Sequence, residues 1–71
     1  MTVAEGLRRF RRERKLTQRE LAAELGMFQQ EIQRYESGRV QPLIGFLIKL
    51  ADAYNVSIDY LVGRTDNPKV G

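Results

Sequence analysis

Apolar residues recur along this chain at the spacing of short amphipathic helices. Between residues 17 and 38, two apolar stripes follow each other: Leu21, Ala22 and Leu25, then Phe28, Ile32 and Tyr35. A glycine follows each stripe, and glycine readily adopts the left-handed conformation that ends a helix. Thr17 and Glu20 have the spacing of a capping box at a helix start. The pattern predicts one helix from about Gln18 to Leu25 and a second from Phe28 or Gln29 to Ser37, joined by a tight turn.

Three further helices are predicted around this pair. A helix over residues 3–15 directs Leu7 and Phe10 inward and leaves most of its arginines outside. A helix from Pro42 to Tyr54 begins at a proline, which suits the first helical position. Ser57 caps a short fifth helix that ends at about Val62, after Asn55 has ended the helix before it. We therefore expect an all-α domain of five helices over residues 1–65 and a polar tail over residues 66–71.

The helix predicted over residues 42–54 is unusually apolar. Its core stripe is expected to consist of Leu43, Leu47, Leu50 and Tyr54, with Phe46 on one flank. Ile44 and Ile48 lie about 100° or more round the helix from this stripe. Either the helix is buried on all sides, or the surplus marks a surface where two copies meet. In the fifth helix Ile58 and Leu61 are expected to face the core, which leaves Tyr60 and Val62 for a possible interface. The candidate dimer residues are therefore Ile44, Ile48, Tyr60 and Val62.

The outer face of the helix over residues 29–37 is rich in amides. It carries Gln30, Gln33, Arg34 and Ser37, with Gln29 on its flank. Glutamine can form paired hydrogen bonds with adenine, and arginine with guanine, at base edges in the major groove. Such a face can also be simply solvated. Its place in the second helix of a helix-turn-helix pair favours DNA reading.

Composition narrows the possible functions. The chain has 71 residues and neither cysteine nor histidine. We expect one domain, no disulfide, no metal site, no cofactor and no catalytic centre, because the usual zinc ligands and the commonest general base are missing. No apolar run is long enough for a membrane span and no secretory signal is evident, so a cytoplasmic location is expected.

The net charge of +3 is unevenly distributed. Residues 1–16 contain six basic and two acidic side chains, whereas residues 17–38 contain two basic and four acidic ones. The positive charge is therefore concentrated in the first predicted helix. This cluster is consistent with phosphate binding, and equally with an ordinary soluble helix.

The helix-turn-helix segment resembles the phage repressor and Cro class of xenobiotic-response-element-like regulators. The resemblance covers roughly residues 4–65. It depends on Leu16, Thr17, Gln18, Leu21, Ala22, Leu25, Gly26, Ile32, Tyr35, Glu36 and Gly38, and continues through Pro42, Leu47, Leu50, Ala51, Val56, Ser57, Leu61 and Gly63. It implies a regulator that binds double-stranded DNA as a homodimer on a pseudo-palindromic operator.

The resemblance also implies a role for individual residues. Base contacts are expected from Gln29, Gln30, Gln33 and Arg34. Phosphate contacts are expected from Thr17, Gln18, Arg19, Arg11, Ser37, Arg39 and Gln41. Arg11 is expected to pair with Glu36, which would tie the first helix to the end of the recognition helix.

Two positions depart from the family pattern. Lys15 stands where the family often has glycine, at a left-handed turn in which another residue costs on the order of 1 kcal/mol. Phe28 replaces a serine or threonine N-cap, whose loss typically costs about 1 kcal/mol. Phe28 either packs inward with its stripe or lies against a thymine methyl group. We expect inward packing.

The leading hypothesis is thus a sequence-specific transcriptional regulator, either a repressor or a small control protein. The alternative is an antitoxin or protein-interaction adaptor with the same fold, in which DNA binding is secondary. Altering the glutamines would disable a regulator, whereas altering the Ile44 and Ile48 surface would disable an adaptor.

Overall fold

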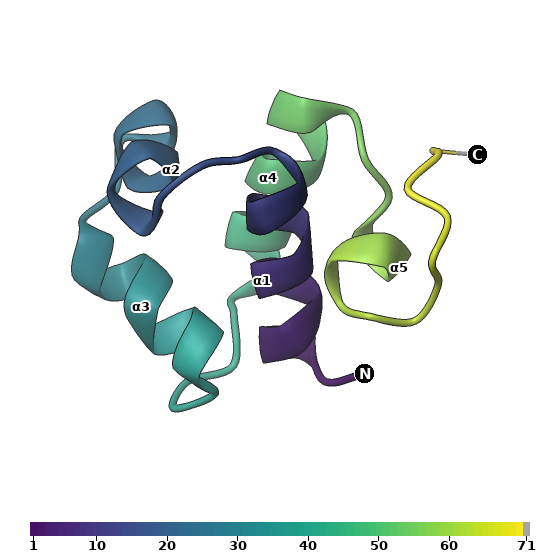
Figure 1. Cartoon of the computed structure of the whole chain (residues 1–71), viewed down its shortest axis with the longest axis horizontal. Coiled ribbons are helices and arrows are strands. Elements are labelled where there is room, and N and C mark those ends of the chain that lie inside the picture. The colour runs from purple at the N-terminus through teal and green to yellow at the C-terminus, as the bar shows by residue number, and fades with distance from the viewer. Residues whose placement is uncertain (71) are drawn as a thin grey trace.

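The computed structural model describes residues 1–70 and contains five helices and no strand within that range. The helices are α1 (Val3–Glu13), α2 (Gln18–Leu25), α3 (Gln29–Ser37), α4 (Ile44–Tyr54) and α5 (Ile58–Leu61). The helices α2 and α3 lie together at one end of the molecule and α5 lies at the other, with α1 and α4 between them (Figure 1). The all-α, five-helix prediction is confirmed.

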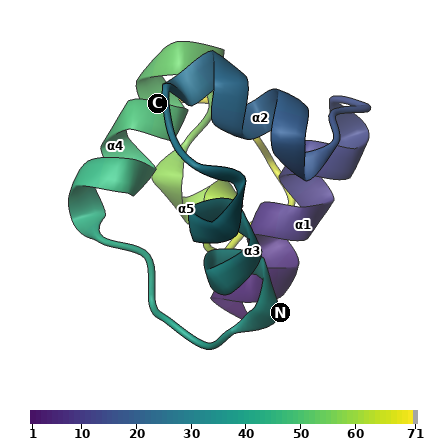
Figure 2. The same ribbon diagram turned by 90° about the vertical axis from the view of Figure 1, so that its left-hand side faces the viewer.

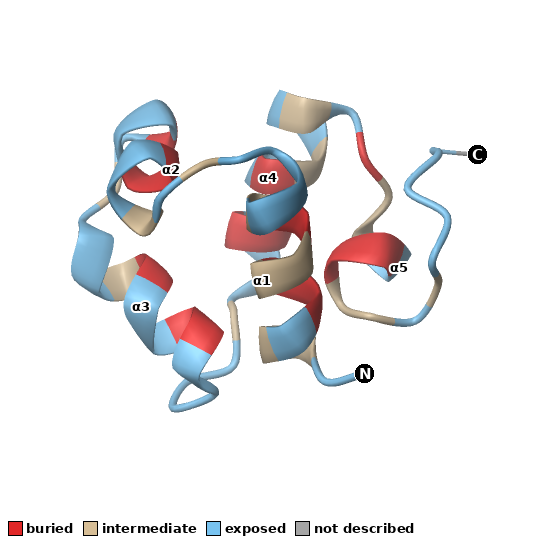
Figure 3. Ribbon diagram, in the orientation of Figure 1, coloured by how far each residue is buried: buried red, intermediate tan, exposed pale blue. Residues whose placement is uncertain are grey.

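Each helix contributes to one core (Figure 3). The largest fully buried side chains are Phe10 of α1, Ile32 of α3, Leu50 of α4 and Leu61 of α5. Leu21, Ala22 and Leu25 add the buried face of α2. The contacts between helices pair α3 with α2 and α1, and α5 with α1 and α4. The orientation of α3 therefore depends on both α1 and α2.

Local sequence signals account for most helix ends. The Thr17 hydroxyl accepts a hydrogen bond from the Glu20 N–H, and the Glu20 carboxylate accepts one from the Thr17 N–H, so the predicted capping box is present. Gly26 and Gly38 end α2 and α3 in the left-handed conformation, at φ values of 67° and 80°. Thr2 and Glu5 form a second capping box at the start of α1, which our sequence analysis missed although the spacing is the same.

The predicted helices α1 and α5 extended one or two residues too far at their C-terminal ends. α1 ends at Glu13 rather than residue 15, because Lys15 has a φ of 57° and cannot continue a right-handed helix. This confirms the left-handed turn expected at Lys15. Asn55 also has a positive φ, 54°, and Ser57 caps α5 as predicted, but α5 ends at Leu61 and Val62 is its C-cap.

The predicted start of α4 was wrong, and so was one member of its predicted core stripe, Leu43; the other three, Leu47, Leu50 and Tyr54, do pack in or against the core. The helix begins at Ile44, and the preceding Leu43 is extended (φ −68°, ψ 147°). A residue outside the helix does not follow its 100° rotation, so Leu43 is exposed rather than in the core. Phe46 takes its place and packs against the ring of Tyr35 with centroids 4.7 Å apart. Ile44 and Ile48 are exposed, which rules out the alternative of a helix buried on all sides.

The segment after α5 runs back along α1. Arg9 donates to the Asp66 carboxylate over 2.8 Å, to the Thr65 carbonyl over 2.9 Å and to the Tyr60 carbonyl over 2.8 Å. The N–H of Ser57 donates to the Pro68 carbonyl over 2.9 Å. Residues 64–68 are therefore attached to the domain by hydrogen bonds from α1 and from the start of α5.

Candidate nucleic-acid interface

Figure 2 turns α2 and α3 toward the viewer, and their outer faces are exposed along most of their length (Figure 3). All four predicted base-contact residues, Gln29, Gln30, Gln33 and Arg34, are exposed on α3. Three of them, with Ser37 and Arg39, line a shallow hollow of about 290 Å³. The structure thus brings Gln30, Gln33 and Arg34 together with two of the predicted phosphate contacts, whereas Gln29 lies outside this hollow.

Ser37 links the end of α3 to the following loop. Its hydroxyl donates to the Arg34 carbonyl over 3.0 Å and accepts from the Arg39 N–H over 3.4 Å. Arg39 and Gln41 are both exposed in the loop between α3 and α4. The loop therefore places Arg39 beside the amide face of α3, on the same hollow.

Glu36 lies at the inner side of α3 and is the buried charged residue of the described chain, with 3% of its surface exposed. Its carboxylate accepts hydrogen bonds from Arg11 Nε over 2.7 Å and Arg11 Nη2 over 3.0 Å. Gln18 Nε2 donates to the same carboxylate over 3.2 Å, and Arg8 donates to the Glu36 backbone carbonyl. The Glu36 side chain of α3 is thus bound by residues of both α1 and α2. The Arg11–Glu36 pair that the resemblance implied is one of these interactions.

This arrangement changes the interpretation of two predicted phosphate contacts. Arg11 Nη1 also donates to the Leu16 carbonyl over 2.7 Å, so every nitrogen of this guanidinium is bonded within the fold. A second role for Arg11 at a phosphate is not supported by this geometry. Gln18 is half-buried with its amide directed to Glu36, whereas Thr17 and Arg19 are exposed at the start of α2.

Most of the α1 arginines that suggested a phosphate-binding cluster form intramolecular contacts. Besides Arg8 and Arg11, Arg9 lies 4.0 Å from the centre of the Tyr60 ring. Arg14, the C-cap of α1, donates to the Tyr54 carbonyl over 3.1 Å and lies over the Phe10 and Tyr54 rings. The positive charge of this helix therefore helps to hold the domain together, which charge counting alone did not reveal.

Two aromatic residues differ from prediction. Phe28 is 76% exposed, so the expectation that it packs inward was wrong. It is the N-cap of α3, and its extended backbone (φ −82°, ψ 143°) removes it from the apolar stripe of the helix. Tyr60, a predicted dimer residue, is buried beneath Arg9, and its hydroxyl donates to Glu13. Val62 is half-buried against the core, so neither Tyr60 nor Val62 offers an open apolar surface.

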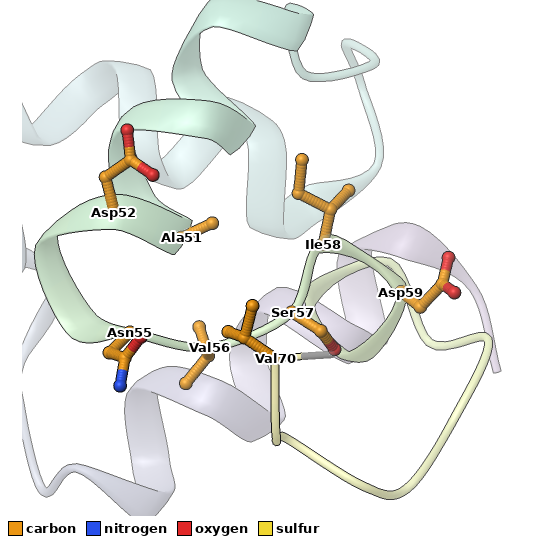
Figure 4. Close-up of a pocket in the computed structure, with 8 residues that line it drawn as sticks. All are labelled: Ala51, Asp52, Asn55, Val56, Ser57, Ile58, Asp59 and Val70. Carbon is orange, nitrogen blue, oxygen red and sulfur yellow. The ribbon is translucent and has the colours of Figure 1, made fainter.

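Another hollow is separate from the α3 face. It measures about 690 Å³ and lies between the end of α4, the start of α5 and the C-terminal segment (Figure 4). Asp52 and Asp59 lie on its rim, and none of the predicted DNA contacts lines it. Two carboxylates there disfavour phosphate. Residues 1–70 contain no cluster of three potential metal ligands, and none of their helices is long and apolar enough to cross a bilayer.

Comparisons with known proteins agree with this geometry. The profile of the helix-turn-helix family HTH_3 matches residues 7–61. The uncharacterized HTH-type transcriptional regulator YobD of Bacillus subtilis is 39% identical over 62 residues, which are 87% of this chain and 55% of YobD. The cryptic phage CTXphi transcriptional repressor RstR of Vibrio cholerae is 39% identical over 64 residues, 90% of this chain and 57% of RstR.

The chain spans little more than half the length of these curated relatives. A solved transcriptional regulator from Listeria innocua superposes with a TM-score of 0.77 at 36% identity, covering 90% of this chain and 60% of that one. The family match covers more than half of the chain, and the two curated relatives are described as a transcriptional regulator and a transcriptional repressor. The chain therefore belongs to the helix-turn-helix family of phage repressor and Cro type, a family of DNA-binding transcriptional regulators.

Proposed function

We propose that this chain binds double-stranded DNA as a dimer on a pseudo-palindromic operator and regulates transcription, with α3 in the major groove. The observation that carries the proposal is the amide and guanidinium face of α3, exposed while the opposite face of the helix is fixed by Glu36. Helix α3 has nine residues, and a helix with its side chains is about 10 to 12 Å across, which fits the roughly 12 Å width of the major groove.

Individual contacts follow from this placement. Gln29, Gln30, Gln33 and Arg34 read base edges, with the amides suited to adenine and the guanidinium to guanine. Positions in the loop and at the start of α2 bind phosphate and set the register of the protein on the duplex. The phosphate contacts that we retain from the sequence are Thr17, Arg19, Ser37, Arg39 and Gln41, with Gln18 at the helix N-terminus.

Dimerisation is supported by an apolar surface at the start of α4. Leu43, Ile44 and Ile48 are 70%, 64% and 46% exposed, which leaves a group of large aliphatic side chains in water. We call these three residues the α4 patch.

The α4 patch equally favours the alternative function, an adaptor or antitoxin that binds another protein. The two functions differ in which surface they require. Specific DNA binding requires the glutamines of α3, whereas an adaptor requires the α4 patch and tolerates loss of the glutamines.

The experiment is a selection from random duplex DNA at near-physiological salt, followed by titration of the enriched sequence and a scrambled duplex. We expect an inverted repeat that binds at least about a thousandfold more tightly than scrambled DNA. Gln29→Ala or Gln30→Ala should cost about 1 to 3 kcal/mol on this site and little on scrambled DNA. Ile48→Lys should disrupt the dimer and thereby weaken operator binding; sedimentation would show the loss of the dimer. Absence of any enriched sequence would refute the proposal and favour the adaptor.

A further inference from the structure

Phe28 occupies a position where an aromatic side chain stabilises neither the core nor the helix. Its 76% exposure is the highest among the exposed large hydrophobic residues of the described chain. The residue does not belong to the core cluster or to the apolar residues packed against it, although the neighbouring Met27 does. An exposed phenyl ring forgoes most of the free energy that its burial would release.

The same residue also leaves α3 without a side-chain cap. A phenyl group cannot accept a hydrogen bond from the first helical N–H groups, and none is made. The start of the helix is held instead by Glu31, whose carboxylate accepts a bond from the Phe28 N–H over 3.1 Å, and by the Glu31 N–H, which donates to the Phe28 carbonyl over 3.0 Å. The helix start is therefore held without the Phe28 side chain, which remains available to a ligand.

The position of Phe28 limits what that ligand is. It directly precedes Gln29 and Gln30 at the N-terminus of α3, the part of a recognition helix that contacts base edges. Among the groups that bases present in the major groove, the apolar one is the C5-methyl group of thymine. A phenyl ring beside two amides therefore matches a thymine next to the bases that the amides read.

We propose that Phe28 is a specificity-determining residue that selects a thymine in each half-site by contact with its C5-methyl group. This inference rests on the proposed function and deepens it by naming the base read by an apolar contact. It requires an extended backbone at residue 28, as observed, so that the ring is outside the packed face of α3.

The test replaces each thymine of the selected operator, one position at a time in both half-sites, with deoxyuridine, which lacks only the methyl group. For the native protein, deoxyuridine at one particular position should weaken operator binding by about fourfold per half-site, and so by roughly sixteenfold when both half-sites are changed. This factor corresponds to the transfer free energy of a methyl-sized group. With Phe28→Ser, the thymine and deoxyuridine operators should bind equally well at that position. Val70→Ser, which removes another exposed apolar side chain far from α3 in sequence, should keep the full discrimination.

Serine is chosen because it restores a capping side chain, so loss of folding does not explain the result. Thermal unfolding of Phe28→Ser at or above the native temperature would verify this. If every deoxyuridine position affected the native protein and Phe28→Ser alike, the inference would be refuted while operator binding by the native protein still supported the proposed function. Failure to select any operator would overturn both.

Discussion

Replacing Glu36 with alanine is expected to destabilise the domain strongly. The Glu36 and Arg11 side chains are 3% and 13% exposed, so removal of the carboxylate leaves a mostly buried guanidinium without its counter-charge. Breaking a buried pair in this way typically costs about 3 to 5 kcal/mol. The Gln18 amide loses its acceptor in the same step.

This cost is large for a domain of 71 residues, whose total stability is on the order of 4 to 11 kcal/mol. In a domain of this size, each kcal/mol shifts the unfolding temperature by roughly 4 to 8 °C. Glu36→Ala should therefore lower the Tm by at least about 12 °C. The measurement is thermal and urea unfolding followed by circular dichroism at 222 nm.

Two variants separate the charge from the shape of the side chain. Glu36→Gln keeps the length and one acceptor oxygen, so it should lie between the native protein and Glu36→Ala. Arg11→Met combined with Glu36→Leu removes both charges, and should cost clearly less than the sum of the two single changes. If Glu36→Ala unfolded within about 4 °C of the native protein, or the two changes were additive, the pair would not hold α3 as we argue.

Three further predictions concern the interface and its supports. Arg39→Ala should weaken binding to all duplexes alike and reduce the slope of log K against log salt by about one unit; an unchanged slope would remove Arg39 from the phosphate contacts. Lys15→Gly should raise the free energy of unfolding by up to about 1 kcal/mol in urea titrations, because it relieves a positive φ of 57°, and destabilisation would contradict this. Burial, and then a 2.5 Å hydrogen bond to Glu24, raise the pKa of Tyr54 to about 12 from 10.0, so the neutral phenol is favoured by folding. Stability from Tyr54 should be complete below pH 10 and decline as the pH rises toward 12; the Tyr54→Phe variant should lack this decline, and equal pH curves for both proteins would exclude it.

The sequence was most informative where structure depends on neighbours in the chain. The capping box at Thr17 and the left-handed residues Gly26 and Asn55 are local features, and each is present as predicted; the left-handed turn at Lys15, which the family resemblance implied, is present too. The missed capping box at Thr2 was equally local and would have been found by searching for the same spacing. These signals fix helix boundaries because they satisfy the backbone groups that a helix leaves unpaired.

The errors arose where the helical wheel was extended past a helix end. Phe28 and Leu43 each fall in phase with an apolar stripe, yet each is an extended N-cap whose side chain leaves the packed face. A single ψ angle decides this, and periodicity does not report it. Long-range pairing was equally inaccessible to the sequence pattern: Arg9 bonds Asp66, which is 57 positions away in the chain.

The distribution of acidic side chains resolves an apparent conflict in the proposed function. Residues 17–38 carry four acidic and two basic side chains, although they contain the helix proposed to enter a polyanion. Each of the four carboxylates is hydrogen-bonded within the domain: Glu20 to Thr17, Glu24 to Tyr54, Glu31 to Phe28 and Glu36 to Arg11.

These bonds determine where the negative charge lies. Glu20 and Glu31 are in the first turns of α2 and α3, where the helix dipole favours a carboxylate, and Glu36 is buried against a guanidinium. The outer face of α3 is left with amides and Arg34. The net charge of the segment is therefore a poor guide to the potential at its DNA-facing surface, because three of its four acidic groups serve to build and orient the two helices.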